Sequence, residues 1–360
     1  MRCLRALAIV SAVFALAGNA RASETDQFMT WNVDIKDSTQ LLNDYLNKAA
    51  QEYVDKRNRS HVKMKNVNEI TEHFYLYLFE GLQSSRLRKH IWDTPEIDRY
   101  PSGDTNFWTF QRSSIYRGLS FPYVMPMART IRIGDIYLGI DKICHFFGFG
   151  RRYFQRYVRL REEGMEDEKA IDTVIKNGLD QESSLVGGLV DGVFSRGDLE
   201  ANFQGFMMLR DLTSAENPLF VRDGKTWKVN RTIDYSKFVT PAFDESYNIS
   251  YYTYFRWRKV GPLLQDRYCN NPEIAEKLHA RFAAYMKYPE SRFLQYMERR
   301  YQETGEEKYK KISLEDLCDR AATKSTDTKN GCRKQACNST KHSEKRASVG
   351  ASCCTARKVQ

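Results

Sequence analysis

Apolar side chains recur at every third or fourth position over much of this chain, and this period limits the fold more than any other feature. After Ser38, which can cap a helix, Leu42, Leu46, Ala49 and Tyr53 fall on one helical face. The same reasoning predicts helices at residues 68–81, 141–163, 167–177, 179–192 and 196–212, two more with Pro272 and Pro289 in their first turns, and a last one that begins at Ser313 and ends near residues 318–322. The chain is therefore expected to be mainly helical.

Strands are expected only where the helical period breaks. Four prolines between residues 93 and 130 indicate an irregular stretch, and residues 131–137 fit a short strand or hairpin arm. Asp223-Gly224 lies between two apolar runs and predicts a two-residue hairpin turn. The predicted fold is a multi-helix orthogonal bundle with one or two short β-hairpins. It forms a single domain over residues 23–319, with a motif core at about 137–212.

The first 22 residues have the pattern of a secretory signal peptide. Arg2 and Arg5 precede an apolar core at residues 6–17, and Ala20-Arg21-Ala22 fits an A-x-A cleavage site. The apolar run is about twelve residues long, whereas a membrane span needs roughly twenty. Cys3 precedes the apolar core instead of following it, so the usual lipoprotein signal is missing. We expect an exported protein, periplasmic or secreted, with neither a lipid anchor nor a transmembrane helix.

The formal charge of +10 is concentrated at the two ends of the chain. The leader has three basic residues and no acidic ones, and residues 320–360 have ten basic residues against two acidic ones. Subtracting these excesses of +3 and +8 leaves −1 for residues 23–319, so the body gives no electrostatic case for binding nucleic acid. The tail is rich in Lys, Ser, Thr and Ala, has almost no large apolar residues and is expected to be disordered.

The cysteines divide between the tail and the body. Four lie in the tail with a spacing that matches no paired C-x-x-C zinc site, so disulfides or mixed thiols are expected there: Cys332, Cys337, Cys353 and Cys354. Cys269 and Cys318 both lie near predicted helix ends, and in an exported protein they are candidates for a disulfide. Cys144 is expected to be a buried thiol.

Two polar motifs carry the candidate site, one at residues 141–146 (Asp-Lys-Ile-Cys-His-Phe) and one at residues 195–205 (Ser-Arg-Gly-Asp-Leu-Glu-Ala-Asn-Phe-Gln-Gly). In each motif a carboxylate and a second polar side chain are four residues apart and share one helix face: Asp141 with His145, and Asp198 with Asn202.

Each aspartate alone also fits helix capping, Asp141 as an N-cap and Ser195-x-x-Asp198 as a capping box. His145, next to Phe146, equally fits a core histidine. Capping requires neither His145 nor Asn202, however, so the two motifs together favour a shared site.

The order Asp-Lys-x-x-His-Phe, then Glu182, then Ser-x-x-Asp-Leu-x-Ala-Asn-x-x-Gly resembles the VanZ-like and YfiM-like bacterial envelope proteins over about residues 137–210, about a fifth of the chain. The resemblance implies that six residues converge between packed helices: Asp141, Lys142, His145, Glu182, Asp198 and Asn202. It implies a site without a reaction. VanZ-like proteins are membrane-embedded and YfiM-like ones lipid-anchored, whereas this sequence shows neither pattern and adds large flanking regions.

Three roles fit such a cluster. Asp141, His145, Glu182 and Asp198 could bind a divalent metal that activates water. Alternatively, His145 could act as a general base oriented by one carboxylate, while Lys142 holds an anionic group. In the third role, Lys142 and His145 pair with the carboxylates and hold two helices in register.

Two further features are candidates for binding. Arg152, Arg156 and Arg159 share one face of the first motif helix and suit a phosphate or an anionic lipid headgroup, although a solvated helix face is the commoner reason for such a pattern. The aromatic run at residues 251–258 could stack sugars or bases, although core packing more often explains it.

No nucleophile elbow, phosphate-binding loop, dinucleotide motif or His-Glu-x-x-His pattern occurs in the sequence. The sequence therefore predicts an exported envelope protein whose polar cluster is structural or binds an anionic envelope lipid or glycan, with Lys142, Arg152, Arg156 and Asn202 as ligand contacts. The alternative is a hydrolase of an envelope lipid or glycan, with His145, Asp141 and Asp198 as catalytic residues and a divalent metal as cofactor.

Overall fold

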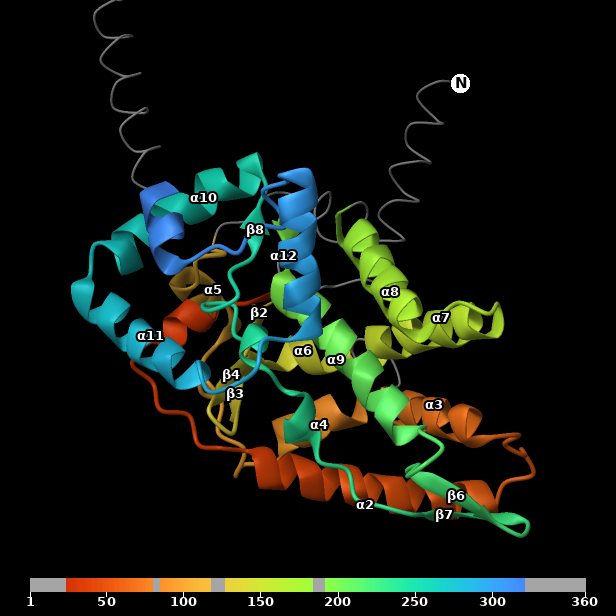
Figure 1. Cartoon of the computed structure of the whole chain (residues 1–360). Helices are drawn as coiled ribbons and strands as arrows, with labels where there is room; N and C mark the ends of the chain where they lie inside the picture. The colour runs from red at the N-terminus through yellow and green to blue at the C-terminus, as the bar shows by residue number, and fades with distance from the viewer. Residues whose placement is uncertain (1–23, 80–84, 118–126, 184–191, 321–360) are drawn as a thin grey trace, which may run out of the picture.

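The computed structural model describes residues 24–79, 85–117, 127–183 and 192–320 (Figure 1). These residues are mainly helical, and their strands occur only as short pairs, which confirms the predicted fold class. The predicted signal peptide, the tail from residue 321 with its four cysteines, and residues 184–191 of the helix predicted at 179–192 lie outside the described residues. No described helix is long and apolar enough to cross a membrane.

Helices α2 (Thr39–Asn58) and α3 (Val67–Leu78) form the base of the bundle in Figure 1. As predicted, α2 buries the side chains of Leu42, Leu46, Ala49 and Tyr53. Ser38 occupies the N-cap position but makes no side-chain capping bond there. Instead, a carboxylate oxygen of Asp37 accepts the hydrogen bond of the Thr39 amide at 2.9 Å.

The centre of the fold is a long helical segment packed against α9 (Arg196–Leu212). This segment consists of α6 (Ile140–Cys144), the π-helical turn η2 (His145–Phe149) and α7 (Gly150–Glu162), close to the predicted 141–163. Two backbones meet here without side chains between them, because a Cβ on Gly205 would lie 1.9 Å from the carbonyl oxygen of Phe146. Glycine at this point therefore sets how closely α9 approaches the first motif helix.

The remaining long helices surround this centre, and two predictions about them are wrong. Helix α8 (Asp167–Gln181) continues through the predicted break near residue 178, because Gly178 lets the helix pass closely over Tyr153. Helix α12 (Arg292–Thr304) begins after Pro289, where Ser291 caps it by accepting the Leu294 amide at 3.2 Å.

Other predicted helices are confirmed. Pro272 opens α11 (Pro272–Tyr285), which follows α10 (Tyr254–Leu264) and the π-helical turn η6 (Gln265–Cys269). Ser313 caps a last helix described at residues 314–320, since its hydroxyl oxygen accepts the amide of Asp316 at 3.0 Å. In the aromatic run, Tyr252 and Trp257 are buried as core residues, whereas Tyr254 and Phe255 are exposed.

Four strand pairs are present among the described residues. The expected hairpin arm is β3 (Thr130–Ile133) paired with β4 (Ile136–Gly139), and β4 leads directly into α6. The second hairpin joins β6 (Phe220–Asp223) to β7 (Thr226–Val229). Its two turn residues are Gly224 and Lys225, one position later than predicted, and Gly224 has a φ of 59° that glycine adopts readily.

The other two strand pairs were not predicted, because two-residue strands have no detectable period. They are β1 (Glu24–Thr25) with β2 (Met127–Ala128), and β5 (Val193–Phe194) with β8 (Tyr251–Tyr252). Three short 3₁₀ turns complete the described connections: η1 (Gln27–Thr30), η4 (Tyr235–Phe238) and η5 (Pro241–Phe243).

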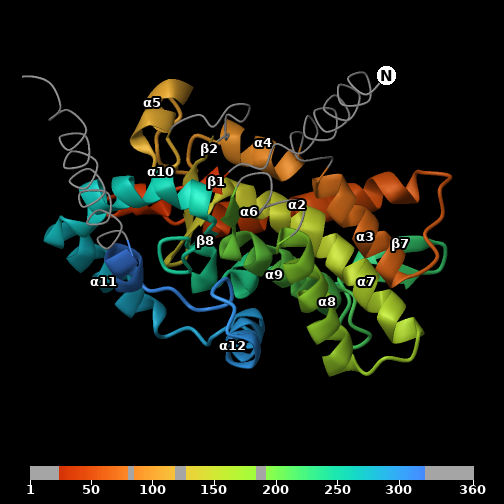
Figure 2. The ribbon, with the colours of Figure 1, turned by 90° about the horizontal axis from the view of Figure 1, so that it is seen from above.

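The stretch expected to be irregular contains a short helix, α5 (Phe107–Ser113), and α4 (Arg86–Asp93) precedes that stretch. Seen from above, α4 and α5 lie along one edge of the molecule, and α8 and α12 lie along the opposite edge (Figure 2). The predicted disulfide between Cys269 and Cys318 is present. Cys144 is a buried thiol, and burial raises its pKa to about 11.

Candidate functional site

The candidate site centres on the ammonium group of Lys142, which is completely buried. Its Nζ lies 2.9 Å from Asp141 Oδ2, 2.7 Å from Asp198 Oδ1 and 2.7 Å from Glu245 Oε1. These carboxylates come from α6, from α9 and from the segment that follows η5. The name polar cluster is used below for six residues: Lys142, Asp141, Asp198, Glu245, His145 and Asn202.

Asp141 is held by its position after β4. The chain turns from β4 into α6 at Gly139, which is the N-cap, so the predicted N-cap role of Asp141 is wrong. The Oδ1 atom of Asp141 accepts the Lys142 amide at 2.9 Å and the hydroxyl of Thr25 at 2.6 Å, which leaves Oδ2 for the Lys142 ammonium. Strand β1 is thereby fastened to the first motif helix.

Asp198 is placed by a capping arrangement that differs from the predicted box. The Ser195 hydroxyl oxygen accepts the Asp198 amide at 3.2 Å, as the motif predicts. The Asp198 carboxylate, however, faces Lys142 and His145 and does not accept the Ser195 backbone amide. Glu182 supplies the second hydrogen bond of the capping arrangement, because its Oε1 accepts the Ser195 amide at 3.3 Å. Glu182 therefore supports the start of α9 and is not in the centre of the polar cluster.

His145 forms the outer edge of the polar cluster. Its Nε2 lies 3.4 Å from Asp198 Oδ2, its Nδ1 lies 3.2 Å from Asn202 Oδ1, and 7% of the residue is exposed. The imidazole stacks on the ring of Phe149 with a centroid distance of 5.1 Å. The guanidinium of Arg152 lies 4.9 Å from the centroid of the same ring, so a stack of three side chains connects the cluster to the surface.

The electrostatics of the polar cluster follow from burial and close charges. Burial alone would lower the pKa of Lys142, but the surrounding carboxylates raise it well above its usual range. Burial likewise opposes ionisation of Asp198, yet the nearby His145 and Lys142 hold the pKa of its carboxyl below the ordinary value. Glu245 behaves differently, because burial outweighs the attraction of Lys142 and, with the nearby aspartates, raises its pKa to about 7.

Glu245 was missed by the sequence analysis. Its Oε1 accepts hydrogen bonds from Lys142 and from the Ser195 hydroxyl at 2.9 Å, while its buried Oε2 has no hydrogen-bond partner among the described residues. Glu245 lies in an irregular segment between a 3₁₀ turn and a two-residue strand, so no helical spacing relates it to either motif. The only signal was an acidic pair, Asp244-Glu245, placed directly after apolar residues.

The structure brings together most of the residues proposed from the sequence. Asp141, Lys142, His145, Asp198 and Asn202 lie in one cluster, and Glu182 joins it through Ser195. Of the two arginines proposed as ligand contacts, Arg152 reaches the edge of the cluster through Phe149. Arg156 is half-buried one turn further along α7 and is not part of that stack.

The residues proposed as metal ligands do not fit a divalent cation. Among the described residues, no group of three or more His, Cys, Asp or Glu side chains is arranged to hold a metal ion. The physical reason is that the Lys142 ammonium occupies the point where three carboxylates converge, and Glu182 faces the Ser195 amide. We derive no metal-dependent step from this arrangement.

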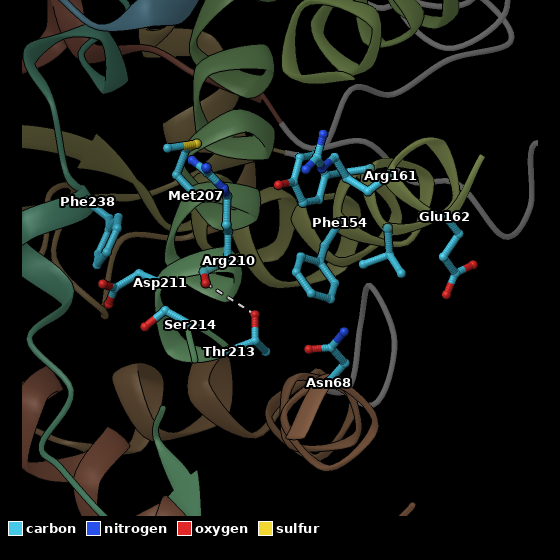
Figure 3. A pocket seen from close by; sticks show the side chains of 12 residues that line it. Asn68, Phe154, Arg161, Glu162, Met207, Arg210, Asp211, Thr213, Ser214 and Phe238 are labelled. Carbon is cyan, nitrogen blue, oxygen red and sulfur yellow. Dashed lines mark hydrogen bonds between the residues drawn. The ribbon is translucent and has the colours of Figure 1, made fainter. Parts of the chain in front are cut away.

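A separate pocket of about 870 Å³ lies at the other end of α9 (Figure 3). Apolar side chains such as Phe154, Met207 and Phe238 share its walls with Arg161 and Arg210. Both arginines already contact the carboxylate of Asp167, Arg210 at 2.6 Å and Arg161 at 3.9 Å. Asp167 compensates one of these two positive charges, and Glu162 and Asp211 add carboxylates to the same lining, so the pocket does not indicate a single class of ligand.

Comparison with protein-family models, with curated proteins and with solved structures found no match for this chain.

Proposed function

We propose that this protein is an exported cell-envelope protein that acts by binding, and that its polar cluster has a structural role and holds segments of the fold together. The position of Lys142 carries this proposal. A lysine that serves as a base or nucleophile must lose its proton, whereas three carboxylates within 2.9 Å raise the pKa of Lys142 and keep it charged. Its charge therefore serves to hold the carboxylates together.

The polar cluster joins segments that are distant in the sequence. Thr25 in β1 binds Asp141 in α6 across 116 positions, and Lys142 binds Asp198 in α9 across 56 positions. Glu245 adds a third segment through Lys142 and Ser195. Removing the Lys142 ammonium leaves the buried carboxylates uncompensated, and breaking a buried ionic group in this way typically costs about 3–5 kcal/mol.

We propose that the ligand binds at the accessible edge of the polar cluster. Arg152 is exposed, and its guanidinium lies over Phe149, which stacks on His145. A cation on an aromatic face, next to a histidine, suits the phosphate of an anionic envelope lipid or an acidic glycan. The resemblance to VanZ-like and YfiM-like envelope proteins and the signal-peptide pattern support the same setting.

Two variants test the two parts of this proposal. Lys142→Met should lower the free energy of unfolding by about 3–5 kcal/mol in urea denaturation. Arg152→Ala should leave stability nearly unchanged and weaken the binding of glycerol 3-phosphate measured by calorimetry, while Arg59→Ala, at an exposed position at the end of α2, should not. A Lys142→Met protein as stable as the parent would refute the structural role of the polar cluster. Equal glycerol 3-phosphate affinities of the two arginine variants would refute the binding edge.

A second candidate function is hydrolysis with His145 as general base. The observation that favours it is the 3.4 Å separation of His145 Nε2 and Asp198 Oδ2, two buried groups at the outer edge of the polar cluster. His145→Asn should then abolish cleavage of an envelope lipid or glycan while the protein stays folded, and His279→Asn, at an exposed surface histidine, should have no effect. If neither variant changes any hydrolysis that the parent protein shows, His145 is not a catalytic base.

A further inference from the structure

Three large aromatic side chains are exposed at the edge of the molecule formed by α4 and α5. Trp92 is 47% exposed, Phe107 42% and Trp108 57%. We call these three residues the aromatic edge. Apolar rings of this size are usually buried, and a group of them on the surface indicates an interaction site.

The aromatic edge is held together by Arg129. Its guanidinium lies 4.6 Å from the ring centroid of Trp92 at the end of α4 and 5.9 Å from that of Phe110 in α5. The same guanidinium donates to the carbonyl oxygen of Thr105 at 2.8 Å, just before α5 begins. Trp92 and the start of α5 therefore lie on one side of the molecule, fixed to a common cation.

Helix α5 presents its first two side chains outward. Phe107 and Trp108 pack edge to face with a centroid distance of 5.1 Å, while Phe110 is buried and anchors the helix. Asn106 caps the helix by accepting the Thr109 amide at 2.9 Å. Figure 2 shows α5 standing out at the edge of the molecule where α4 also lies, and the two rings at the start of this helix are exposed.

The chain segments that carry the aromatic edge have an excess of positive charge, unlike the body as a whole. Residues 85–117 and 127–130 carry seven Arg or Lys residues against four Asp or Glu residues, whereas residues 23–319 together carry −1. Arg99 adds a second guanidinium, 5.2 Å from the ring centroid of Trp92. This part of the surface therefore combines exposed aromatic rings with an excess of cations.

We propose that the aromatic edge docks on the surface of an anionic phospholipid membrane. Tryptophan and phenylalanine are favourable at the boundary between headgroups and acyl chains, and arginines next to them bind lipid phosphates. Two adjacent exposed rings at the start of a short helix suit shallow insertion, and the nearby Arg99 and Arg129 match the negative headgroups. This inference does not depend on the role of the polar cluster.

Vesicle binding tests the proposal. The exported chain, residues 23–360, is mixed with vesicles of phosphatidylglycerol and phosphatidylethanolamine, and with phosphatidylcholine vesicles as the neutral comparison. Binding is measured by co-sedimentation, and insertion by quenching of tryptophan fluorescence with brominated lipids. The tail carries an excess of +8 and attracts anionic vesicles by itself, so every variant retains it and binding is measured at both low and high salt.

The double variant Phe107→Ala, Trp108→Ala should bind phosphatidylglycerol vesicles roughly tenfold or more weakly, and the loss should persist at high salt because it removes apolar contacts. Met286→Ala, at a residue that is 76% exposed outside the aromatic edge, should bind like the parent. Bromine quenching should fall in the double variant. The proposal is overturned if the double variant binds as tightly as the parent, since the tail then accounts for binding. It is also overturned if the parent chain binds no vesicle. A last outcome overturns it as well: light scattering shows a dimer for the parent and a monomer for the double variant, so that the two rings form a dimer interface.

Discussion

Glu245→Gln should make the protein more stable above pH 7, although it removes a partner of a buried lysine. Glu245 Oε1 accepts from Lys142 and Ser195, and glutamine retains an oxygen at that position. The glutamine NH₂ then takes the place of Oε2, which has no hydrogen-bond partner among the described residues. The substitution therefore resembles protonation of Glu245, with almost no change in shape.

The expected size follows from the pKa of Glu245, which burial raises from 4.5 to about 7. Because the folded-state pKa is the higher one, the folded protein binds more protons than the unfolded chain between these two values. The contribution of Glu245 to stability is therefore fully present below pH 4.5 and is lost as pH rises through about 7. Each pKa unit corresponds to about 1.4 kcal/mol, so the complete loss is roughly 3 kcal/mol.

Urea denaturation of parent and variant at steps between pH 4.5 and 8.5 measures this effect. The difference in the free energy of unfolding should be near zero at pH 4.5 and should grow in favour of Glu245→Gln, up to roughly 3 kcal/mol by pH 8. Carboxyl groups outside the polar cluster titrate alike in both proteins, so their contributions cancel in the difference. Glu276→Gln, at an exposed position, is the matched control and should show a constant small difference. A difference that stays flat with pH, or one that favours the parent at high pH, would refute this account of Glu245.

Two further predictions concern the packing and the covalent link of the fold. Gly205→Ala should destabilise the protein by about 3 kcal/mol or more in urea denaturation, because the added Cβ would lie 1.9 Å from the Phe146 carbonyl oxygen; Gly103→Ala, whose nearest neighbouring atom is 3.9 Å away, should change stability by less than about 0.5 kcal/mol. Replacing Cys269 and Cys318 by serine should lower the free energy of unfolding by about 2–4 kcal/mol, because the disulfide closes a loop across 49 positions; equal stability of parent and serine variant under oxidising conditions would contradict it.

The helices could be predicted because an amphipathic helix repeats its pattern over many residues. Helix α9 was predicted with the bounds that the structure shows, Arg196–Leu212, since Ser195 gives a capping signal and apolar residues follow at helical spacing. The break predicted near residue 178 is wrong, because α8 continues through Gly178 to Gln181. Gly178 packs against Tyr153, and that tertiary contact decides the residue type.

The polar cluster was predictable only on its helical members. Four-residue spacing placed Asp141 with His145 and Asp198 with Asn202, and all four lie in the polar cluster, where His145 contacts Asp198 and Asn202 and Asp141 contacts Lys142. Thr25 and Glu245 could not be found in this way, since a two-residue strand and an irregular segment have no period that relates them to the motifs. The carboxylate of Glu245, which the sequence did not indicate, also changes the chemistry, because three carboxylates around one ammonium leave no place for the metal that the sequence suggested.

The charges of the polar cluster explain why Lys142 and Glu245 should respond in opposite ways to substitution. With all three carboxylates ionised, Lys142 compensates only one of them, and the remaining negative charge is costly in a buried site. Protonation of Glu245 near pH 7 relieves part of this excess, whereas loss of the Lys142 ammonium increases it. In the double variant Lys142→Met, Glu245→Gln, the second change should therefore recover part of the stability lost by the first, and more of it at pH 8 than at pH 5. If Lys142 and Glu245 instead formed an isolated, balanced ion pair, Glu245→Gln alone would destabilise the protein most at pH 8, where both charges are present.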